Sequence, residues 1–305
     1  MTAASVLIPS HSRAGSLALA VRSVLAQTIR DLEVIIIGDG VGDDVRAVAI
    51  RLMEEDPRVR FLDLPKGPNH GEIHRHDAIL AAKSDAIFYL CDDDLLLPEH
   101  VAELLALLDT HSFVQSLNGY VSPDGTIHRY SGSLADAAAV GHVLNDELRF
   151  NFISITGTAH SRDFYLGLDA PWSTTPPGEW PDHAQWKKMI GQPGFLGATS
   201  SRMTALQFPA TQPERHDWSV EKQLAELQGW AERIRLPDAQ AAIDRLVFDA
   251  TEIEFGHAVW ELHVAMAALR ALESHRATLE SHRAALENTL SWRITRPLRA
   301  VRRRF

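Results

Sequence analysis

Short apolar runs alternate with stretches of helical spacing over the first hundred residues. The runs, each ended by polar or glycine residues, cover residues 6–8, 34–37, 59–62 and 86–90. Apolar residues recur every three or four positions over residues 17–25, 45–52 and 73–82, and again after Pro98. Continuous apolar strands joined by helices are typical of a mostly parallel sheet that is covered on both faces. The pattern therefore predicts an α/β fold for this part of the chain.

The second hundred residues carry a less regular pattern. Residues 118–130 are expected to form a hairpin that turns at a Pro-Asp-Gly sequence, and residues 153–156 to form a strand. Residues 171–181, rich in Pro, Trp, Thr and Gly, predict a loop. Asp182 then lies at or near the N-cap of a helix.

From residue 213 onward the chain is expected to be helical, and its last part repeats every seven residues. One row of the repeat is leucine throughout, at Leu272, Leu279 and Leu286. The other row is mixed, with Leu269, Arg276, Arg283 and Leu290. Arginine in half the positions of a row predicts a weak coiled coil. We expect residues 259–290 to pack on the body of the protein or to pair loosely with a second copy.

The composition excludes several classes of protein. The chain has 305 residues, of which 45% are hydrophobic and 23% charged, a globular balance that excludes wholesale disorder. Cys91 is the only cysteine, which excludes an internal disulfide and a zinc cluster of the CxxC type. The formal net charge of -10 is not that of a nucleic-acid-binding domain, so no nucleic-acid partner is expected.

The charge is uneven along the chain. Residues 291–305 contain six arginines and no acid, which leaves 24 basic against 40 acidic residues, a formal charge of -16, on the rest. Arginines interleaved with apolar residues suit an interfacial anchor on anionic lipid, and a frayed end or a strap on the acidic body is the alternative. No apolar run is long enough to span a bilayer and the start is not that of a signal peptide. We therefore expect a cytoplasmic protein that can sit at the inner face of the cell membrane.

Polar residues that could carry chemistry follow three of the predicted strands. The most prominent are Asp92, Asp93 and Asp94, which come directly after the buried run 86–90. Three crowded carboxylates repel one another, and a divalent cation such as Mg²⁺ or Mn²⁺ would compensate for that repulsion. The alternative is an acidic turn in which Asp94 only caps the next helix. The position after a buried strand, where α/β sheets bind ligands, favours the cation.

Other candidates are weaker one by one. Asp39 lies in a Gly-Asp-Gly turn, where its carboxylate could accept a hydrogen bond from a ligand or serve only the turn. Arg13 and Arg75 could clamp phosphate oxygens or be solvated surface residues. Asp182 is a candidate general base that could equally be a helix cap, and Glu179 is its rival.

Four motifs in this order resemble the inverting family 2 glycosyltransferases of the GT-A fold. They are Val6-Leu7-Ile8-Pro9-Ser10-His11-Ser12-Arg13, Ser23-Val24-Leu25-Ala26-Gln27-Thr28, Glu33-Val34-Ile35-Ile36-Ile37-Gly38-Asp39-Gly40, and Asp92-Asp93-Asp94 with Pro98. The likeness is clear over residues 1–100 and looser up to residue 190. Residues 291–299 also resemble a tail appended to bacterial surface-polysaccharide transferases.

The resemblance implies a Rossmann-like, mostly parallel central sheet flanked by helices, with a C-terminal helical extension. On this basis we expect a catalytic domain over residues 1–212 and a helical extension over residues 213–258. A heptad-like helix with a basic amphipathic tail would occupy residues 259–305.

The resemblance also implies roles for the residues of the nucleotide-sugar site. Pro9, Ser10 and His11 would line the nucleotide pocket with Arg13 beside them, as implied by the family's first motif. Asp39 would bind the nucleotide base.

Arg75 would approach the diphosphate, and Asp92 would face the ribose or the sugar. Asp93 falls on the metal ligand of the family with Asp94 close by, so a divalent cation, Mg²⁺ or Mn²⁺, is the expected cofactor. Asp182 inherits the role of the catalytic base.

The function implied is transfer of a sugar, with inversion, from a nucleotide-diphosphate sugar to a hydroxyl of a glycan or lipid-linked saccharide. Two other classes stay open at this stage. One is a metal-dependent nucleotide-sugar hydrolase or nucleotidyltransferase on a similar sheet. The other is a non-catalytic scaffold that acts through its C-terminal helices.

Overall fold

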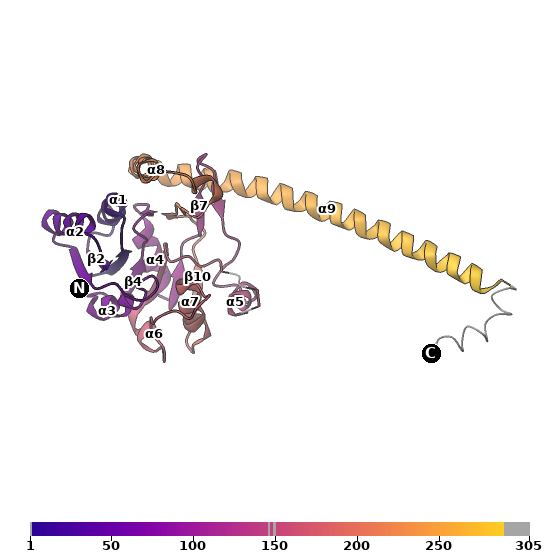
Figure 1. Ribbon diagram of the computed structural model, residues 1–305, viewed down its shortest axis with the longest axis horizontal. Helices are drawn as coiled ribbons and strands as arrows, with labels where there is room; N and C mark the ends of the chain where they lie inside the picture. The colour runs from indigo at the N-terminus through magenta and orange to yellow at the C-terminus, as the bar shows by residue number, and fades with distance from the viewer. Residues whose placement is uncertain (1, 146, 149–150, 290–305) are drawn as a thin grey trace. The chain divides into compact units, whose positions relative to one another are not determined.

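The computed structural model describes residues 2–145, 147–148 and 151–289. The chain divides into two compact units, Met1–Ala250 and Thr251–Phe305. The predicted division at residues 212 and 258 stays a prediction. Figure 1 shows the strands of the first unit with helices on both sides.

A seven-stranded sheet in the order β10-β6-β9-β4-β1-β2-β3 forms the centre of the first unit. Its strands are β1 (Ala4–Ser10), β2 (Leu32–Asp39), β3 (Val59–Leu64), β4 (Ala86–Tyr89), β6 (Phe113–Gln115), β9 (Thr158–Ser161) and β10 (Gly197–Thr199). Only β9 runs antiparallel to its neighbours, β4 and β6, and the other pairings are parallel. The four predicted apolar runs form β1 to β4, which confirms the mostly parallel α/β sheet.

Helices cover both faces of the sheet because alternate side chains of each buried strand point to opposite faces. The helices of the first unit are α1 (Ala14–Leu25), α2 (Asp43–Glu55), α3 (His74–Ala81), α4 (His100–Leu108), α5 (Ala137–Leu144), α6 (Arg162–Leu166), α7 (Pro181–Gly191), a 3₁₀ turn (Pro213–Arg215) and α8 (Val220–Arg233). Val6 and Ile8 pack with α1, α2 and α4 on one face. Leu7 packs with α3 and α7 on the other.

Two small antiparallel pairs accompany the main sheet. The hairpin of β7 (Gly119–Val121) and β8 (Ile127–Arg129) confirms the prediction for residues 118–130. The other pair joins β5 (Leu95–Leu96), just after the acidic triplet, to β11 (Ala205–Leu206). The predicted loop of residues 171–181 is also found, and it leads into helix α7, which begins at Pro181. Asp182 is the second residue of that helix.

The prediction of a strand over residues 153–156 is wrong, since the strand begins at Thr158. The side chain of Asn151 accepts a hydrogen bond from the Ile153 N–H and donates one to the Ile153 carbonyl, both at 3.0 Å. The indole N–H of Trp186 donates to the same carbonyl at 3.1 Å. These side chains take the backbone groups that a sheet ladder would have used.

Helix α9 (Ala239–Glu287) contains the seven-residue repeat. Ala239, Ile243 and Ala250 are buried, whereas from Thr251 onward nearly every described side chain is exposed. The basic segment 291–305, for which a membrane anchor is predicted, lies outside the described residues. Within the described part of the chain, no helix is long and apolar enough to cross a membrane.

The second motif of the sequence clamps the segment that follows the acidic triplet. The amide group of Gln27, which is fully buried, donates to the Leu97 carbonyl at 2.7 Å and accepts from the Val101 N–H at 2.9 Å. Ser23 accepts from the Leu96 N–H at 3.2 Å. Ser23 of helix α1 and Gln27, two residues after its end, therefore hold β5, the residue after it and the start of α4 by hydrogen bonds to their backbones.

We expect Gln27→Met to lower the free energy of unfolding by about 1–3 kcal/mol, because it strips buried backbone groups of their partners. The urea midpoint of the purified protein measures this. Gln223→Met is the matched control, since Gln223 is partly exposed and makes one long hydrogen bond to the Trp218 carbonyl at 3.3 Å. Equal losses in the two variants would contradict the clamp.

Candidate active site

A cavity of about 240 Å³ lies beyond the carboxyl ends of β1, β2 and β4. It is lined by Pro9, Ser10, His11, Ser12, Arg13, Ile37, Asp39, His70, Gly71, Cys91, Asp92 and Asp93. The structure therefore brings together every residue predicted to bind the nucleotide sugar except Arg75. Parallel strands end at one edge of the sheet, which is why motifs so far apart in the sequence meet there.

Asp39 is held at the floor of this cavity by neighbouring groups. The Lys66 ammonium donates to its Oδ2 and the Gly67 N–H to its Oδ1, both at 2.6 Å. Burial alone would raise the pKa of Asp39, but these contacts and the nearby His74 lower it, so the carboxylate is charged. The ring N–H of His11 donates to the Asp39 carbonyl at 2.6 Å, which joins the ends of β1 and β2.

The turn that covers Asp39 also anchors the loop before helix α7. Gly71 lies so close to Asp39, with a φ of +66°, that any Cβ there would overlap the carboxylate. The buried Glu72 accepts from the Thr175 N–H at 2.7 Å and from the His70 N–H at 3.0 Å. Asn69 donates to the Thr175 carbonyl at 3.1 Å. The turn of residues 69–72, which borders the cavity, and the loop 171–180 are thus joined by direct hydrogen bonds.

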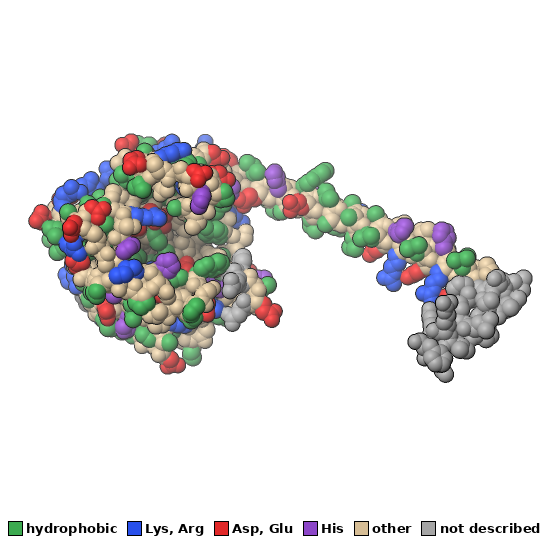
Figure 2. All heavy atoms as spheres, in the orientation of Figure 1, with side chains coloured by type: hydrophobic (Ala, Val, Ile, Leu, Met, Phe, Trp, Pro, Cys, Tyr) green, Lys and Arg blue, Asp and Glu red, His purple; other side chains and the backbone are tan. Residues whose placement is uncertain are grey.

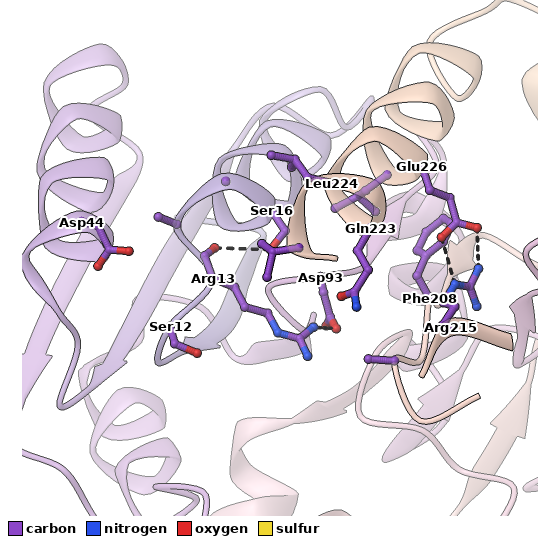
Figure 3. A pocket seen from close by; sticks show the side chains of 15 residues that line it. Ser12, Arg13, Ser16, Asp44, Asp93, Phe208, Arg215, Gln223, Leu224 and Glu226 are labelled. Carbon is purple, nitrogen blue, oxygen red and sulfur yellow. Dashed lines mark hydrogen bonds and ion pairs between the residues drawn. The ribbon is translucent and has the colours of Figure 1, made fainter. Parts of the chain in front are cut away.

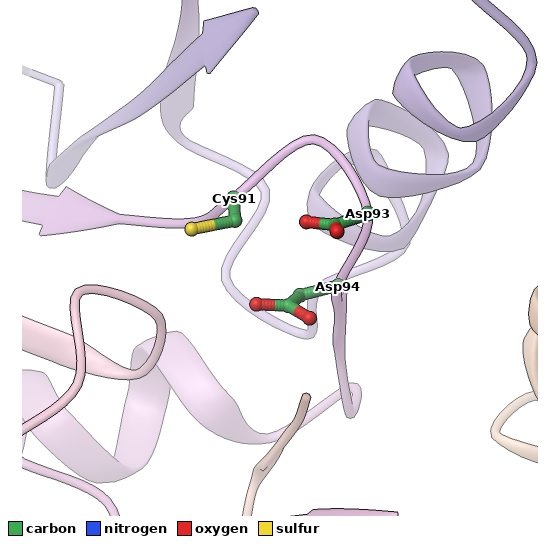
Figure 4. A group of neighbouring side chains, drawn as sticks. All are labelled: Cys91, Asp93 and Asp94. Carbon is green, nitrogen blue, oxygen red and sulfur yellow. The ribbon is translucent and has the colours of Figure 1, made fainter. Parts of the chain in front are cut away.

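The acidic triplet curves away from the end of β4. Ligand atoms of Cys91, Asp93 and Asp94 lie within 4.8 Å of one another, and Figure 4 shows the three side chains around one space. Asp94 accepts from the Thr156 hydroxyl at 2.5 Å and from the Phe208 N–H at 2.9 Å. Burial raises the pKa of Asp94 to about 6.

These residues fit a divalent cation. Each oxygen of Asp94 keeps a lone pair beyond its single hydrogen bond, and a cation would offset the cost of burying the carboxylate. Carboxylate oxygens are the ligands of hard cations such as Mg²⁺ and Mn²⁺. The thiol of Cys91 is a softer donor, and burial raises its pKa, so the two carboxylates are the stronger candidates.

Arg13 and Asp93 form an ion pair that lies on the shared wall of the 240 Å³ cavity and a second cavity. The second one, of about 430 Å³, lies between the start of α1 and helix α8 and shares Ser12, Arg13 and Asp93 with the first. Figure 3 shows the Arg13 guanidinium pointing at the Asp93 carboxylate, with Gln223 of α8 nearby. Asp92 instead accepts from the Ser10 hydroxyl at 2.7 Å.

Arg75 is a buried residue of helix α3 and is not among the residues that line the 240 Å³ cavity. Its Nε and Nη1 atoms have no hydrogen-bond partner among the described residues. Burial lowers its pKa, whereas Cys91, Tyr89, Asp182 and Glu72 act in the opposite direction. A buried guanidinium with unused donors is costly unless a ligand meets them.

The position of Arg75 depends on a chain of buried aromatic groups. Its guanidinium carbon lies 4.6 Å from the centre of the Trp172 ring, a cation–π contact. The indole N–H of Trp172 donates to the Tyr89 hydroxyl at 3.1 Å. Tyr89 in turn donates to His160 Nε2 at 2.8 Å, because the other ring nitrogen donates to the Ser161 carbonyl.

Asp182 and Glu179, the two candidates for the base, have different surroundings. Asp182 is largely buried at the start of α7, and burial raises its pKa although the His183 N–H and the charge of Arg75 act against the shift. Glu179 is exposed and pairs with Lys187 at 3.4 Å. Of the two, Asp182 has the surroundings of the stronger base, because burial raises its pKa, whereas Glu179 is exposed and paired with Lys187.

Tyr130, which the sequence analysis did not single out, belongs to the same group. Burial raises its pKa to about 12, and Tyr120, Asp94 and Asp182 act in the same direction. Its hydroxyl is therefore neutral, and the charges of Asp94 and Asp182 both act on it. The only feature of the sequence that pointed to Tyr130 was the predicted hairpin of residues 118–130, which ends at this residue.

A comparison with models of protein families identifies the family of this chain. The model of glycosyl transferase family 2 matches residues 5–161, more than half of the chain. The chain is a member of glycosyl transferase family 2. The family assignment expected from the four motifs is thus confirmed.

Relatives of this family 2 member match over limited segments. The GalNAc(5)-diNAcBac-PP-undecaprenol beta-1,3-glucosyltransferase of Campylobacter jejuni is 29% identical over 104 residues, 33% of each protein. The chondroitin synthase of Pasteurella multocida is 36% identical over 126 residues, which cover 40% of this chain and 13% of that one. The chain thus aligns with a third or less of the length of these relatives.

Among solved structures, S. aureus TarS 1-349 in complex with UDP aligns with a TM-score of 0.52 and 14% identity. The alignment covers 83% of this chain and 72% of that one. At this identity the likeness concerns the fold, and it confirms the GT-A architecture of this family 2 protein.

We expect Glu72 to stabilise the native state in a pH-dependent way. Burial alone would raise its pKa, but hydrogen bonds from Thr175 and from the backbone lower it to about 2, against an ordinary 4.5. Because the native pKa is below the unfolded one, the contribution is complete above pH 4.5 and is lost as the pH falls towards 2.

In urea denaturation, Glu72→Gln should cost on the order of 3 kcal/mol at pH 7 and clearly less at pH 3. Glu232→Gln, an exposed position on α8, is the control and should cost little at either pH. A cost that is the same at both values of pH would show that the carboxylate charge is not what holds the turn.

Proposed function

We propose that this protein transfers a sugar, with inversion, from a nucleotide-diphosphate sugar to a hydroxyl of a glycan or lipid-linked saccharide. The observation that carries the proposal is the buried Arg75, whose Nε and Nη1 have no hydrogen-bond partner among the described residues and whose charge interacts with Cys91, which lines the cavity. An anion within reach of these nitrogens would satisfy them. The diphosphate of a sugar nucleotide is an anion of that kind.

The donor would occupy the 240 Å³ cavity with its base near Asp39 and its diphosphate towards Arg13 and Arg75. Pro9, Ser10 and His11 would form the wall at the end of β1, and Asp92 would bind a ribose or sugar hydroxyl. The solved TarS structure is a complex with UDP, which supports a nucleotide donor. The nucleotide base of the donor is to be identified by comparing the melting temperatures of the protein with different sugar nucleotides.

In the chemical step, the acceptor hydroxyl attacks the anomeric carbon from the face opposite the diphosphate. The bond between that carbon and the phosphate oxygen breaks, and the diphosphate leaves with the electron pair. Asp182 takes the proton of the hydroxyl, and its raised pKa makes it a stronger base than an exposed aspartate. Tyr130 can donate a hydrogen bond within the same space.

Asp93 and Asp94 would hold the divalent cation, which neutralises charge on the departing diphosphate when it is bound. Asp93 also forms an ion pair with Arg13. If the cation took Asp93, Arg13 could pair with the phosphates of the donor instead, so both charged groups would keep a partner.

The acceptor class is inferred from the relatives. The Campylobacter enzyme is named for an undecaprenol-linked saccharide and the Pasteurella enzyme for a polysaccharide. A lipid-linked acceptor agrees with the anionic membrane surface proposed for residues 291–305, and both remain proposals.

We expect one sugar nucleotide among UDP-, GDP-, dTDP- and CMP-sugars to raise the melting temperature of the full-length chain, and Mg²⁺ or Mn²⁺ to enlarge the shift. Asp93→Ala should abolish the effect of the cation, while Asp169→Ala, at an exposed position, should behave as the parent. An equal shift in excess chelator, or in Asp93→Ala, would rule out the assignment of the cation to Asp93.

With the donor found in this way, Asp182→Asn should lower sugar transfer by about 10²–10⁴-fold while the donor-induced melting shift is kept. The amide fills the same space but cannot accept the proton. Glu179→Gln is the matched control and should transfer at the parental rate. If Glu179→Gln is inactive and Asp182→Asn is not, the base is Glu179, and donor cleavage that needs no acceptor would indicate a hydrolase instead.

A further inference from the structure

The described part of the second unit is a helix whose large apolar side chains face solvent. They are Ile253, Phe255, Trp260, Leu262, Val264, Met266, Leu269, Leu272, Leu279 and Leu286. Figure 2 shows apolar side chains over the length of this helix. A helix gains most of its stability from packing of an apolar face, so a surface of this kind calls for a partner.

Two rows of the seven-residue repeat form what we call the seam. The first row reads Phe255, Leu262, Leu269, Arg276 and Arg283. The second row reads Ala258, Ala265, Leu272, Leu279 and Leu286. The first row therefore changes from large and apolar to charged, while the second changes from small to large, at the same point of the helix.

In a parallel, in-register pair of such helices, each residue of the seam faces the same residue of the second copy, which is unfavourable at several positions. Each Arg276 would face the Arg276 of the second copy, and each Arg283 its counterpart. Like charges held side by side in a seam repel each other. The small Ala258 and Ala265 would face their own copies as well, which leaves those layers thinly packed.

An antiparallel pair removes both difficulties. When Leu269 of one copy faces Leu272 of the other, steps of seven residues outward bring Leu262 opposite Leu279 and Phe255 opposite Leu286. The same register brings Arg276 opposite Ala265 and Arg283 opposite Ala258. Each large residue then meets a large one, and each arginine meets an alanine over which its aliphatic stem can lie.

The charges beside the seam match the same register. Glu261 and Glu254 directly precede Leu262 and Phe255, so they flank the half of the helix that receives the arginines of the second copy. His275 and His282, which directly precede those arginines, lie on the same flank. Acidic residues near one end and basic residues near the other favour a head-to-tail arrangement of two identical helices.

The arginines are available for such contacts. Among the described residues, Arg276 and Arg283 pair along their own helix with Glu280 and Glu287 at 3.0 Å, and all four side chains are well exposed. Ion pairs exposed in this way contribute little, so an arginine can be shared with an acid of the second copy.

We propose that two copies of this chain associate through an antiparallel pair of these helices, from Phe255 to Leu286. The overlap of 32 residues corresponds to a seam roughly 50 Å long. The proposal does not depend on the proposed activity, since it concerns only the helix after Ala250.

Cross-linking of the full-length chain tests the direction of the pair. Cys91 is replaced by serine, and Phe255→Cys and Leu286→Cys are made singly in that background. The antiparallel pair predicts disulfide-linked dimers only when the two variants are mixed. Dimers from each variant alone would indicate a parallel pair and overturn the proposal, and so would the absence of any cross-link.

The molar mass in solution, measured by light scattering at tens of micromolar chain, should be that of two copies. Leu272→Asp should halve it, while Ser274→Asp, on the opposite side of the helix, should not. Glu261→Arg and Arg276→Glu should each weaken the dimer at least tenfold, and the double variant should recover most of that loss. A monomeric parent, or a double variant weaker than both single ones, would contradict the register.

Discussion

The site depends on the cost of burying charge at one edge of a sheet. Two carboxylates, Asp92 and Asp94, and the guanidinium of Arg75 are withdrawn from water where the parallel strands end. Burial disfavours the charged form of each group, so the fold must supply partners or leave places for them. Thr156, Ser10 and Arg13 supply some of these partners. Under the proposed function, a ligand would supply the partner that Nε and Nη1 of Arg75 lack among the described residues.

Much of the surrounding structure serves to hold these charged groups in place. Ser23 of helix α1 and Gln27, just after that helix, fix the segment that follows the triplet. The Tyr89 hydroxyl accepts from the indole N–H of Trp172 and donates to His160, and these hydrogen bonds orient the ring that contacts Arg75. All of these supporting side chains are buried.

The sequence was most informative where the chemistry is local. Continuous apolar runs predicted β1 to β4, and the polar residues after them predicted the composition of the nucleotide cavity. The strand at residues 153–156 failed because a side chain, Asn151, takes the backbone groups of Ile153, which no pattern of hydrophobicity reveals. Glu72 and Trp172 were missed for a related reason. Their roles arise from contacts between segments about a hundred residues apart, Glu72 with Thr175 and Trp172 with Arg75, and depend on the finished fold.

The contact between Glu72 and Thr175 couples two sides of the site. The turn that bears His70 and Gly71 borders the 240 Å³ cavity, and the loop held by Thr175 leads to Asp182. Because Glu72 and Asn69 hold that loop directly, the turn cannot be displaced without moving the loop or breaking these hydrogen bonds. Under the proposed function, binding of the donor and placement of the candidate base are therefore thermodynamically linked, and the linkage acts in both directions.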